Sequence, residues 1–471
     1  MPMTAARESI HGQWSSRWIF VLAATGSAVG LGNIWRFPYI TGESGGGAFV
    51  LVYLLCVALV GLPIMMAEIL LGRRGRRSPI NTMAVLAEDE GLRPSWRYLG
   101  WMGVLAGFVI LSFYSVVAGW AVAYIVYVAS GTFAGATIET SQGVFDGLIG
   151  SAASLVWWHS LFMVLVVVVV ARGVQGGLEQ AVKYLMPALF AMLLLLVGYA
   201  LFSGDALSAV HYLFDPDFSK ITGDAVLAAL GQAFFSLSLG MGSIMIYGSY
   251  LPNDASIPQT SIIIAGADTL VALLAGLAIF PIVFGYGLEP GQGPGLVFIT
   301  LTIAFGHMPG GQFFGGMFFV LLTVAAWTSA ISLLEPVAAW MVESFGWSRL
   351  KACLVGGGGA WLLGIGSALS FNHWAGFAPA GRNFFDWSEF LSTNVLLPLG
   401  GMLIAVFAGW RMRLASTMEE MGSGPSVLFR AWLGLVLFVA PVGVLVVFLE
   451  GTGLRALLVD GLGRLAATVF G

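Results

Sequence analysis

Gly26-Ser27-Ala28-Val29-Gly30-Leu31-Gly32-Asn33 is the stretch that decides the fold, and it lies inside an apolar segment that runs from about residue 18 to 40. Hydrocarbon enforces helical backbone, because unpaired backbone polar groups are costly there. The stretch nevertheless carries three glycines in seven positions, and each weakens a helix by about 1 kcal/mol relative to alanine. A membrane helix broken at its midpoint frees carbonyls and amides to hold an ion or a small zwitterion, so the stretch favours a transport function.

The composition is that of a polytopic membrane protein. Of the 471 residues, 58% are hydrophobic and 9% are charged, which excludes a soluble domain of this length. Neither a phosphate-binding loop nor an HExxH zinc motif occurs, so ATP-driven transport and metalloprotease chemistry lack support. We expect a protein that is not an enzyme and whose partners are a small molecule and the lipid bilayer, with no nucleic acid. The sequence leaves the oligomeric state open.

Apolar runs of membrane-spanning length predict an all-α polytopic membrane protein with about 11 transmembrane helices. The predicted spans cover residues 15–41, 44–71, 98–130, 154–172, 182–202, 225–250, 260–286, 312–343, 351–369, 389–410 and 427–449. The predicted organisation is an N-terminal segment (1–14), spans one to five (15–202), an external loop (203–224), spans six to ten (225–413) with an external cap (288–311), and a last span with its tail (425–471). Residues 454–470 are mildly amphipathic and are predicted to lie at the membrane interface, with a twelfth span as the alternative.

Arginine placement predicts the orientation in the membrane. The connection between the second and third spans carries Arg73, Arg74, Arg76, Arg77, Arg93 and Arg97. Loops rich in Lys and Arg stay on the cytoplasmic side. Alternating from that loop places the N-terminus in the cytoplasm and the C-terminus outside, in a multi-pass protein of the inner (plasma) membrane.

A second break interrupts the sixth span, where small residues follow one another from Gly231 to Ser243. Taken alone, such a run is also typical of close helix packing. Together with the first break it occupies the corresponding position of two five-span halves. Interrupted helices in corresponding positions are the sequence pointer to inverted repeats with a binding site at the membrane midplane.

At these residues the chain resembles the neurotransmitter:sodium symporter family, in its bacterial amino-acid branch. The strongest parts of the resemblance are residues 26–38, 68–73 and 232–242 and the pair Thr328-Ser329. The resemblance implies a leucine-transporter-like fold of two inverted five-helix repeats, with the first and sixth helices broken at the midplane. It also implies sodium-driven uptake of a small amino acid by alternating access.

Sodium is a hard cation that prefers oxygen ligands, and the resemblance implies two sites for Na+. The first would use Ala28, Asn33, Ser236 and Asp268, completed by the carboxylate of the substrate. The second would use Gly26, Val29, Ala325, Thr328 and Ser329. Without the resemblance, the hydroxyls of the last two residues would be interpreted as bonding within their own helix.

Asp268 departs from the pattern of many relatives, which carry asparagine there and hold chloride near a serine one turn on. This chain has Ala272 one turn on, while Tyr53 and Gln232 match other parts of the chloride site. A buried carboxylate supplies the negative charge that chloride otherwise brings beside sodium. We therefore expect chloride-independent transport.

The substrate pocket follows from the same resemblance. Amides at a helix N-terminus favour a carboxylate, and the carbonyls of the second break suit an ammonium group. The amine-transporting relatives carry aspartate at the position of Gly30, so glycine favours an amino acid over an amine. The expected substrate-binding residues are Ser27, Ala28, Leu31, Gly32, Ile110, Tyr114, Phe235, Ser236, Ser238, Met241, Ser329 and Leu333. Because they are apolar or hydroxylic and Met241 can re-pack, we expect hydrophobic amino acids from leucine to the aromatics.

Gates are expected on both sides of the site. Outside, Arg36 would pair with Glu389, or with Asp386 as the alternative, above a lid of Tyr114 and Phe235. Inside, the gate would use Trp14, Tyr250 and Glu343. The arginine expected three residues before Trp14 is His11, which leaves Arg7, Arg17 or a protonated His11 as its replacement.

Two further carboxylates lie within predicted spans. Glu68 is expected to bond freed backbone near the first break, and Glu335 to play a similar structural role in the eighth span. Neither is expected to be catalytic.

Two other functions remain open at this stage. A symporter of the same architecture could carry another zwitterion, such as a betaine or a GABA-like osmolyte, although that would favour more aromatic faces or a polar end in the pocket. A non-transporting sensor is the second alternative. The intact set of candidate sodium ligands argues against it, because a sensor could lose them freely.

Overall fold

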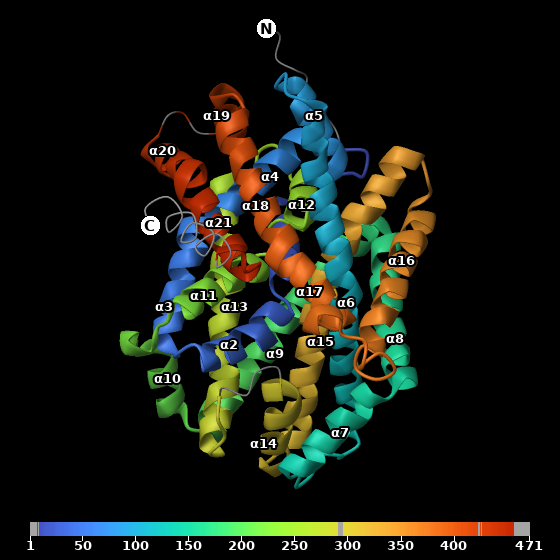
Figure 1. The fold of residues 1–471 in the computed structure, drawn as a ribbon, viewed down its shortest axis with the longest axis vertical. Helices are drawn as coiled ribbons and strands as arrows, with labels where there is room; N and C mark the ends of the chain where they lie inside the picture. The colour runs from blue at the N-terminus through green and yellow to red at the C-terminus, as the bar shows by residue number, and fades with distance from the viewer. Residues whose placement is uncertain (1–6, 8, 291–294, 423, 425, 456–471) are drawn as a thin grey trace, which may run out of the picture.

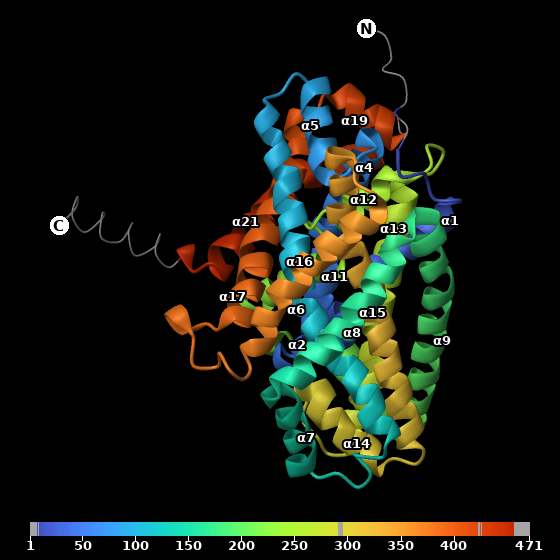
Figure 2. The same cartoon turned by 90° about the vertical axis from the view of Figure 1, so that its right-hand side faces the viewer.

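The computed structural model describes residues 7, 9–290, 295–422, 424 and 426–455, and the regular structure in these residues is entirely helical. The predicted interfacial stretch 454–470 therefore lies almost wholly outside the described residues. The all-helical architecture agrees with the expectation from composition. Figures 1 and 2 show a helical bundle whose long helices run between two opposite ends.

The spanning elements follow the predicted runs closely. They are α1 (Arg17–Ala28) with α2 (Phe37–Glu43), α3 (Gly47–Cys56) with α4 (Leu62–Gly75), α6 (Arg97–Ala129), α8 (Ala152–Ala171), α9 (Gln180–Ser203), α11 (Gly223–Ser236) with α12 (Ser243–Ser249), α13 (Ile257–Gly285), α15 (Gly311–Phe345), α16 (Arg349–Leu369), α17 (Phe384–Phe390) with α18 (Leu397–Val406), and α20 (Val427–Gly434) with α21 (Ala440–Gly451). Within the described residues, nine helices are long and apolar enough to cross a membrane, or ten with the bent α1–α2 pair. The halves α11 and α12, of 14 and 7 residues, are too short to count singly, so a total of 11 stays a prediction.

The first break is a change of backbone direction at the glycine-rich stretch. α1 ends at Ala28, Val29 adopts an extended conformation with ψ of 105°, and a π-helical turn from Gly32 to Arg36 leads into α2. The two halves are bent by 50°. Val29 still donates its N–H to the carbonyl of Thr25 at 2.7 Å, which leaves the next amides free of the α1 ladder.

The second break is tighter and uses left-handed backbone. Ser238, Gly240 and Gly242 have φ of 55°, 76° and 76°, a region that glycine enters without steric penalty. Glu68 accepts a hydrogen bond from the amide of Gly240 at 2.5 Å. The expectation that Glu68 serves the first break is therefore wrong: its carboxylate holds freed backbone of the second break, because α4 packs against α12.

α6 and α15 form the centre of the bundle. They pack against each other along their length, and α1 packs on α15 and α13. In the most apolar window of α6, 83% of the residues are buried, against 22% for the Val427–Gly451 helix. The last span is therefore peripheral and faces lipid, whereas α6 and α15 present side chains to both broken helices.

Several shorter helices lie between the predicted spans, four in the connections and one, α14, in the predicted external cap. They are α5 (Pro79–Asp89), α7 (Ile138–Gly150), α10 (Ala206–Phe214), α14 (Leu301–His307) and α19 (Leu414–Met421). α10 forms because Asp205 caps it, accepting from the amide of Ser208 at 3.0 Å. α5 and α19 lie at one end of the molecule and α7 and α14 at the other (Figures 1 and 2).

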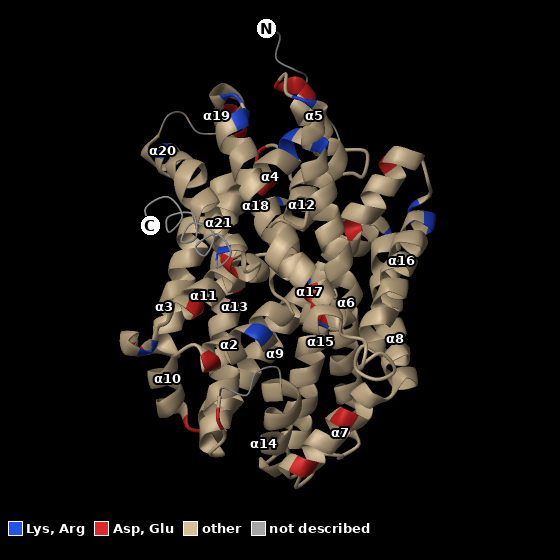
Figure 3. Ribbon diagram, viewed as in Figure 1, with Lys and Arg blue, Asp and Glu red and all other residues tan. Residues whose placement is uncertain are grey.

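Many of the basic side chains lie at one of these two ends. Lys and Arg gather around α4, α5 and α19 (Figure 3). Arg73 pairs with Glu420 of α19 and donates to the carbonyl of Ala255, both at 2.5 Å. Arg76 donates to the carbonyl of Leu251 at 2.5 Å. The arginine-rich connection is therefore a structural clamp as well as an orientation signal.

Candidate functional site

A small central cavity lies where both broken helices face α6 and α15. It measures about 20 Å³, room for one or two waters. Ten of the twelve predicted substrate-binding residues line it, and Gly30 joins them, whereas Leu31 and Ser236 lie outside it. The lining residues are Ser27, Ala28, Gly30, Gly32, Ile110, Tyr114, Phe235, Ser238, Met241, Ser329 and Leu333.

Gly30 lies against two of the hydroxyl groups of this cavity, those of Tyr114 and Ser329. A Cβ at Gly30 would lie 2.5 Å from Ser329 Oγ and 2.7 Å from Tyr114 Oη, so no larger side chain fits without displacing them. Tyr114 Oη accepts from the amide of Leu31 at 3.1 Å. The amide of Leu31 and the hydroxyl of Tyr114 therefore lie side by side near the cavity. Both are hydrogen-bond donors, and such a pair at the start of a helix suits a carboxylate.

Three of the four residues expected at the first sodium site form one buried network. Asn33 donates to Asp268 Oδ1 at 2.7 Å, and Ser236 donates to Asp268 Oδ2 at 2.9 Å. Tyr53 Oη lies 3.0 Å from Ser236 Oγ, and Asn33 Oδ1 accepts from the amide of Gly30 at 3.2 Å. Asp268 is fully buried.

The carboxylate of Asp268 has neutral partners only. Among the described residues, no ion pair reaches it. An ionised carboxylate buried without a counter-charge is strongly unfavourable, and oxygen donors are the ligands of hard cations. The donor set therefore fits a sodium ion, for which Asp268 supplies the charge.

The second group of candidate ligands converges on Ser329. Its Oγ lies 3.3 Å from the carbonyl of Gly26, 3.0 Å from that of Ser27 and 3.2 Å from that of Val29. Thr328 Oγ1 donates to the carbonyl of Ala325 at 3.0 Å. The structure thus brings all five expected residues together and adds the carbonyl of Ser27, a residue that was expected only at the substrate site. These oxygens fit a second hard cation, and their role as sodium ligands stays a prediction.

The residues that match the chloride site of relatives are arranged around the same network. Gln232 donates to the carbonyl of Gly32 at 2.7 Å, which ties the second broken helix to the first. Its Oε1 is buried and has no hydrogen-bond partner. Ala272 is buried on α13 and contributes no hydroxyl to this region.

A larger vestibule of about 270 Å³ lies outside the central cavity. Arg36, Asp386 and Glu389 all line it, together with Tyr114 and Phe235. The Arg36 guanidinium stacks 4.8 Å from the ring centroid of Phe235. Within the described residues no ion pair joins Arg36 to either carboxylate.

The two candidate partners of Arg36 differ in what else they do. Asp386 closes a capping box with Asn383 at the start of α17. Removing it from that box would uncap the helix. Glu389 lies one turn further along α17 and is not part of this capping box. The structure therefore favours Glu389 as the residue that meets Arg36 when the vestibule closes.

The opposite side of the cavity is tightly closed. Trp14 donates its backbone amide to the carbonyl of Tyr250 at 3.0 Å, and its indole to the carbonyl of Tyr247 at 3.1 Å. Tyr250 donates to Glu335 at 2.6 Å, and Glu335 pairs with Arg349. Sequence reasoning missed Arg349 and placed Glu335 in a local role, because their meeting depends on how α15 turns into α16.

His11 stands where the resemblance predicts an arginine. Its Nε2 lies 3.0 Å from Glu343 Oε1, with both side chains almost fully buried. Glu343 also accepts from the amide and hydroxyl of Ser78 at 2.7 and 2.6 Å. Arg7 instead pairs with Asp89 at 2.7 Å and holds the pKa of that carboxyl below its ordinary value. Arg17 bonds Gln259 at 3.4 Å and lies 5.1 Å from the ring centroid of Trp18. Of the three candidates, His11 is therefore the one that contacts Glu343, and its role in a gate stays a prediction.

These contacts define the state of the molecule. The side of the molecule that holds Trp14 and Tyr250 is sealed by buried networks. The vestibule lies on the opposite side of the cavity, and among the described residues its arginine is not paired with a carboxylate. The structure therefore represents an arrangement that is closed at the inner gate predicted from the sequence, with a nearly closed central cavity.

The replacement His11→Ala is expected to loosen the inner latch. A buried hydrogen bond to a charged partner contributes about 1.5 kcal/mol, so amide hydrogen exchange of residues 9–20 should rise roughly tenfold. His11→Arg should keep exchange slow. Arg17→Ala is the matched control, because Arg17 lies on the same segment, is exposed, and contacts Gln259 and Trp18 rather than Glu343. Equal exchange in wild type and His11→Ala would show that the latch does not depend on His11.

Comparisons with known proteins agree with this architecture. The family described as the sodium:neurotransmitter symporter family matches residues 11–143 and 138–453. The uncharacterized sodium-dependent transporter YhdH of Bacillus subtilis is 39% identical over 94% of this chain and 98% of its own length. An uncharacterized sodium-dependent transporter of Methanocaldococcus jannaschii is 30% identical over 89% of this chain and 86% of its own length.

A solved structure extends the comparison to three dimensions. MhsT in complex with L-phenylalanine superimposes with a TM-score of 0.87 at 44% identity, covering 93% of this chain and 99% of that one. This likeness confirms the predicted fold class, because it spans nearly the whole of both chains.

Proposed function

Because this chain belongs to the sodium:neurotransmitter symporter family, we propose that it uses a sodium gradient to carry a hydrophobic L-amino acid into the cell, without a requirement for chloride. Sodium-dependent transport is the activity of the family and of its similar relatives. The amino-acid range, the two sodium sites and the ligands named above are the specific parts of the proposal. The orientation is also part of the proposal: the protein lies in the inner (plasma) membrane with its N-terminus in the cytoplasm.

One observation carries the proposal: Asp268 is a buried carboxylate that accepts hydrogen bonds from the side chains of Asn33 and Ser236 and, among the described residues, pairs with no cationic side chain. Asn33 links this carboxylate to the central cavity, because it also accepts from the amide of Gly30, which lines that cavity. A sodium ion at this network would compensate the charge of Asp268 and attract the carboxylate of a substrate. Ion and substrate would thus favour each other's binding, which is the basis of coupling.

The cavity lining supports an amino acid with an apolar side chain. Gly30 leaves no anion for an amine, and no larger residue fits there. Ile110, Met241 and Leu333 form the apolar part of the lining. The related transporter MhsT forms a complex with L-phenylalanine, and a similar hydrophobic amino acid suits this lining.

Transport then requires the two gates to alternate. Closing the vestibule brings Arg36 to Glu389 above the bound substrate, with Tyr114 and Phe235 between. Opening the inner side separates Trp14 from Tyr250 and releases the His11–Glu343 pair. Each gate consists of polar contacts that a few kcal/mol can break, so ligand binding energy is sufficient to shift the balance between them.

The experiment is uptake of radiolabelled L-leucine into proteoliposomes that hold the purified full chain, under an inward sodium gradient. We expect uptake to collapse when potassium replaces sodium, and excess phenylalanine or tryptophan to compete. Replacing chloride by gluconate should leave the rate within twofold. An uptake rate that is the same with and without the sodium gradient would overturn the main proposal. Competition by betaine or GABA in place of the hydrophobic amino acids would overturn the substrate class.

A further inference from the structure

The inner latch contains a side chain whose charge can change near neutral pH. His11 Nε2 lies 3.0 Å from Glu343 Oε1, and the two side chains are only 4% and 3% exposed. Histidine is the side chain that ordinarily gains or loses its charge between pH 5 and 8. The arginine that the resemblance predicts at this position would stay charged throughout that range. At this latch a permanent charge is therefore replaced by one that a proton adds or removes.

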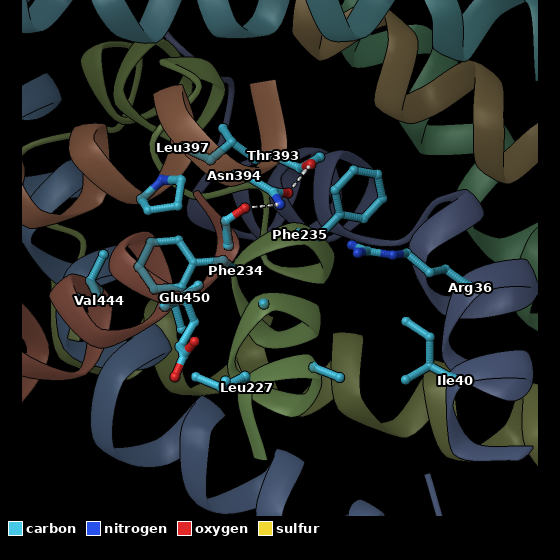
Figure 4. A pocket seen from close by; sticks show the side chains of 15 residues that line it. Arg36, Ile40, Leu227, Phe234, Phe235, Thr393, Asn394, Leu397, Val444 and Glu450 are labelled. Carbon is cyan, nitrogen blue, oxygen red and sulfur yellow. Dashed lines mark hydrogen bonds between the residues drawn. The ribbon is translucent and has the colours of Figure 1, made fainter. Parts of the chain in front are cut away.

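The vestibule presents a cation of the other kind. Arg36 lies between the vestibule and a neighbouring cavity of about 200 Å³. Figure 4 shows its guanidinium directed toward the ring of Phe235, 4.8 Å from the ring centroid. A guanidinium keeps its charge in proteins. A shift of pH near neutrality therefore acts on the imidazole of the inner latch and not on this arginine.

Glu343 is surrounded by hydrogen-bond donors from the start of α5. It accepts from the amide and hydroxyl of Ser78 at 2.7 and 2.6 Å and from Asn81 Nδ2 at 2.7 Å. These donors suit an ionised carboxylate, which only accepts hydrogen bonds. Among the described residues, His11 is its ion-pair partner. A buried carboxylate without a counter-charge is unfavourable, so the protonated imidazole stabilises the closed latch more than the neutral one does.

The other charged and titratable groups on the elements around His11 already have partners. They are Tyr250 with Glu335 and Arg349, Arg76 and Arg77 with backbone carbonyls, Arg7 with Asp89, and Glu179 with Ser15. The ring of Tyr250 packs against His11, with 6.0 Å between the ring centroids. Because these groups are engaged with one another, a proton on His11 acts through Glu343.

The N-terminal segment is attached to both ends of α5. Arg7 donates two hydrogen bonds to Asp89 at the end of α5, at 2.7 and 2.8 Å. His11 reaches Glu343 beside the start of α5, and Trp14 of the inner gate follows three residues later. The His11 bond therefore lies between an anchor and the gate. Movement of Trp14 away from its closed position pulls on that bond.

From these observations we infer that the His11–Glu343 pair is a proton-binding site, and that a proton bound there holds the inner gate closed. If closure strengthens proton binding, the proton favours closure by the same factor. The stabilisation is present at low pH and is lost as pH rises and the imidazole becomes neutral. The inference rests on the proposed transport function and orientation, which make the inner side the cytoplasm. Its consequence is that cytoplasmic acidification slows transport.

The first test measures amide hydrogen exchange of residues 9–20 in the purified full chain in nanodiscs, at pH 5.5 and 7.5, without sodium or amino acid. Dividing each observed rate by the intrinsic rate at the same pH gives protection factors that can be compared. In wild type we expect roughly fivefold higher protection at pH 5.5, because the charged pair is the stronger one. His11→Arg should show high protection at both pH values. His11→Gln, a neutral donor that does not titrate, should show low protection at both.

Two results would overturn the inference. One is wild-type protection that is the same at both pH values, and the other is a pH effect that survives in His11→Gln. His211→Gln is the matched control, because His211 also lies near a carboxylate, 3.8 Å from Asp215, but its side chain is 65% exposed. It should keep the full wild-type pH effect. Loss of the effect in His211→Gln would show that it does not arise at the inner latch.

Leucine uptake supplies the second readout. In right-side-out membrane vesicles held at an external pH of 7.5, lowering the internal pH from 7.5 to 5.5 should reduce the maximal rate of wild type severalfold. The rates of His11→Arg and His11→Gln should not depend on internal pH. An equal reduction in His11→Gln would assign the effect to another group and contradict the inference. Because hydrogen exchange needs no transport, a failure of sodium-driven uptake would count against the proposed function, and exchange would still decide on the proton site.

Discussion

Replacing Asp268 by asparagine is expected to reduce sodium-driven uptake in gluconate medium by tenfold or more. The carboxylate is fully buried and lacks a cationic partner among the described residues. Two unit charges at 4 Å interact by about 4 kcal/mol at an effective dielectric constant near 20. A third of that value already corresponds to roughly tenfold in ion affinity. The measurement is the sodium dependence of leucine uptake by wild type and Asp268→Asn in matched chloride and gluconate media.

Chloride should restore part of the lost uptake in Asp268→Asn, and more in the double variant Asp268→Asn, Ala272→Ser. Relatives with asparagine at this position hold chloride near a serine one turn on, and Tyr53 and Gln232 are already present nearby. Asp224→Asn, an exposed change in the first turn of α11, is the control for a general loss of charge. Unchanged sodium affinity of Asp268→Asn in gluconate would show that this carboxylate does not serve sodium.

Gly30→Ala is expected to abolish uptake, by about 100-fold or more, while the protein still folds. The added Cβ would lie 2.5 Å from Ser329 Oγ and 2.7 Å from Tyr114 Oη. Both side chains must then move. Both are expected substrate-binding residues, and Ser329 is also a candidate ligand of the second sodium site. A displacement near 1 Å in a binding site costs about 100-fold in rate. Uptake and thermal unfolding, measured on the same preparation, separate loss of function from loss of fold.

Gly266→Ala is the matched control for this variant, because its Cβ meets nothing within 4 Å. It should leave both uptake and unfolding temperature unchanged. Substrate binding by Gly30→Ala should weaken together with sodium binding, since Ser329 is also a candidate sodium ligand. Wild-type uptake by Gly30→Ala would contradict the close packing around this glycine. It would also contradict the argument that no larger side chain, and hence no carboxylate, fits at this position.

Much of the fold could be predicted from local sequence. Apolar runs mark spans because a single helix must satisfy its own backbone in lipid, and glycine clusters mark breaks because they weaken that helix. The helices α5, α7, α10 and α19 lie in predicted connections, and α14 lies in the predicted external cap. They are short, so hydropathy alone does not reveal them.

The candidate site was predictable where residues of one segment act together. Gly26, Val29 and Asn33 lie within eight positions, and the break itself indicates that their oxygens are free. Hydrogen bonds and ion pairs between residues of different helices were not predictable without a family pattern. Glu335 meets Tyr250 and Arg349, and Glu68 serves the second break rather than the first, because each pairing depends on which helices lie side by side.

The sequence by itself determined that this chain is a bundle of membrane helices with two breaks, because the cost of unpaired backbone in hydrocarbon is a local property of each segment. Through the resemblance it also indicated the candidate ligands at those breaks. Only the tertiary structure decided that Asp268 has neutral partners, that His11 completes the inner latch, and that Arg36 lies between two cavities. These facts depend on distances between segments as much as 332 positions apart, as for His11 and Glu343, which local physical chemistry does not fix.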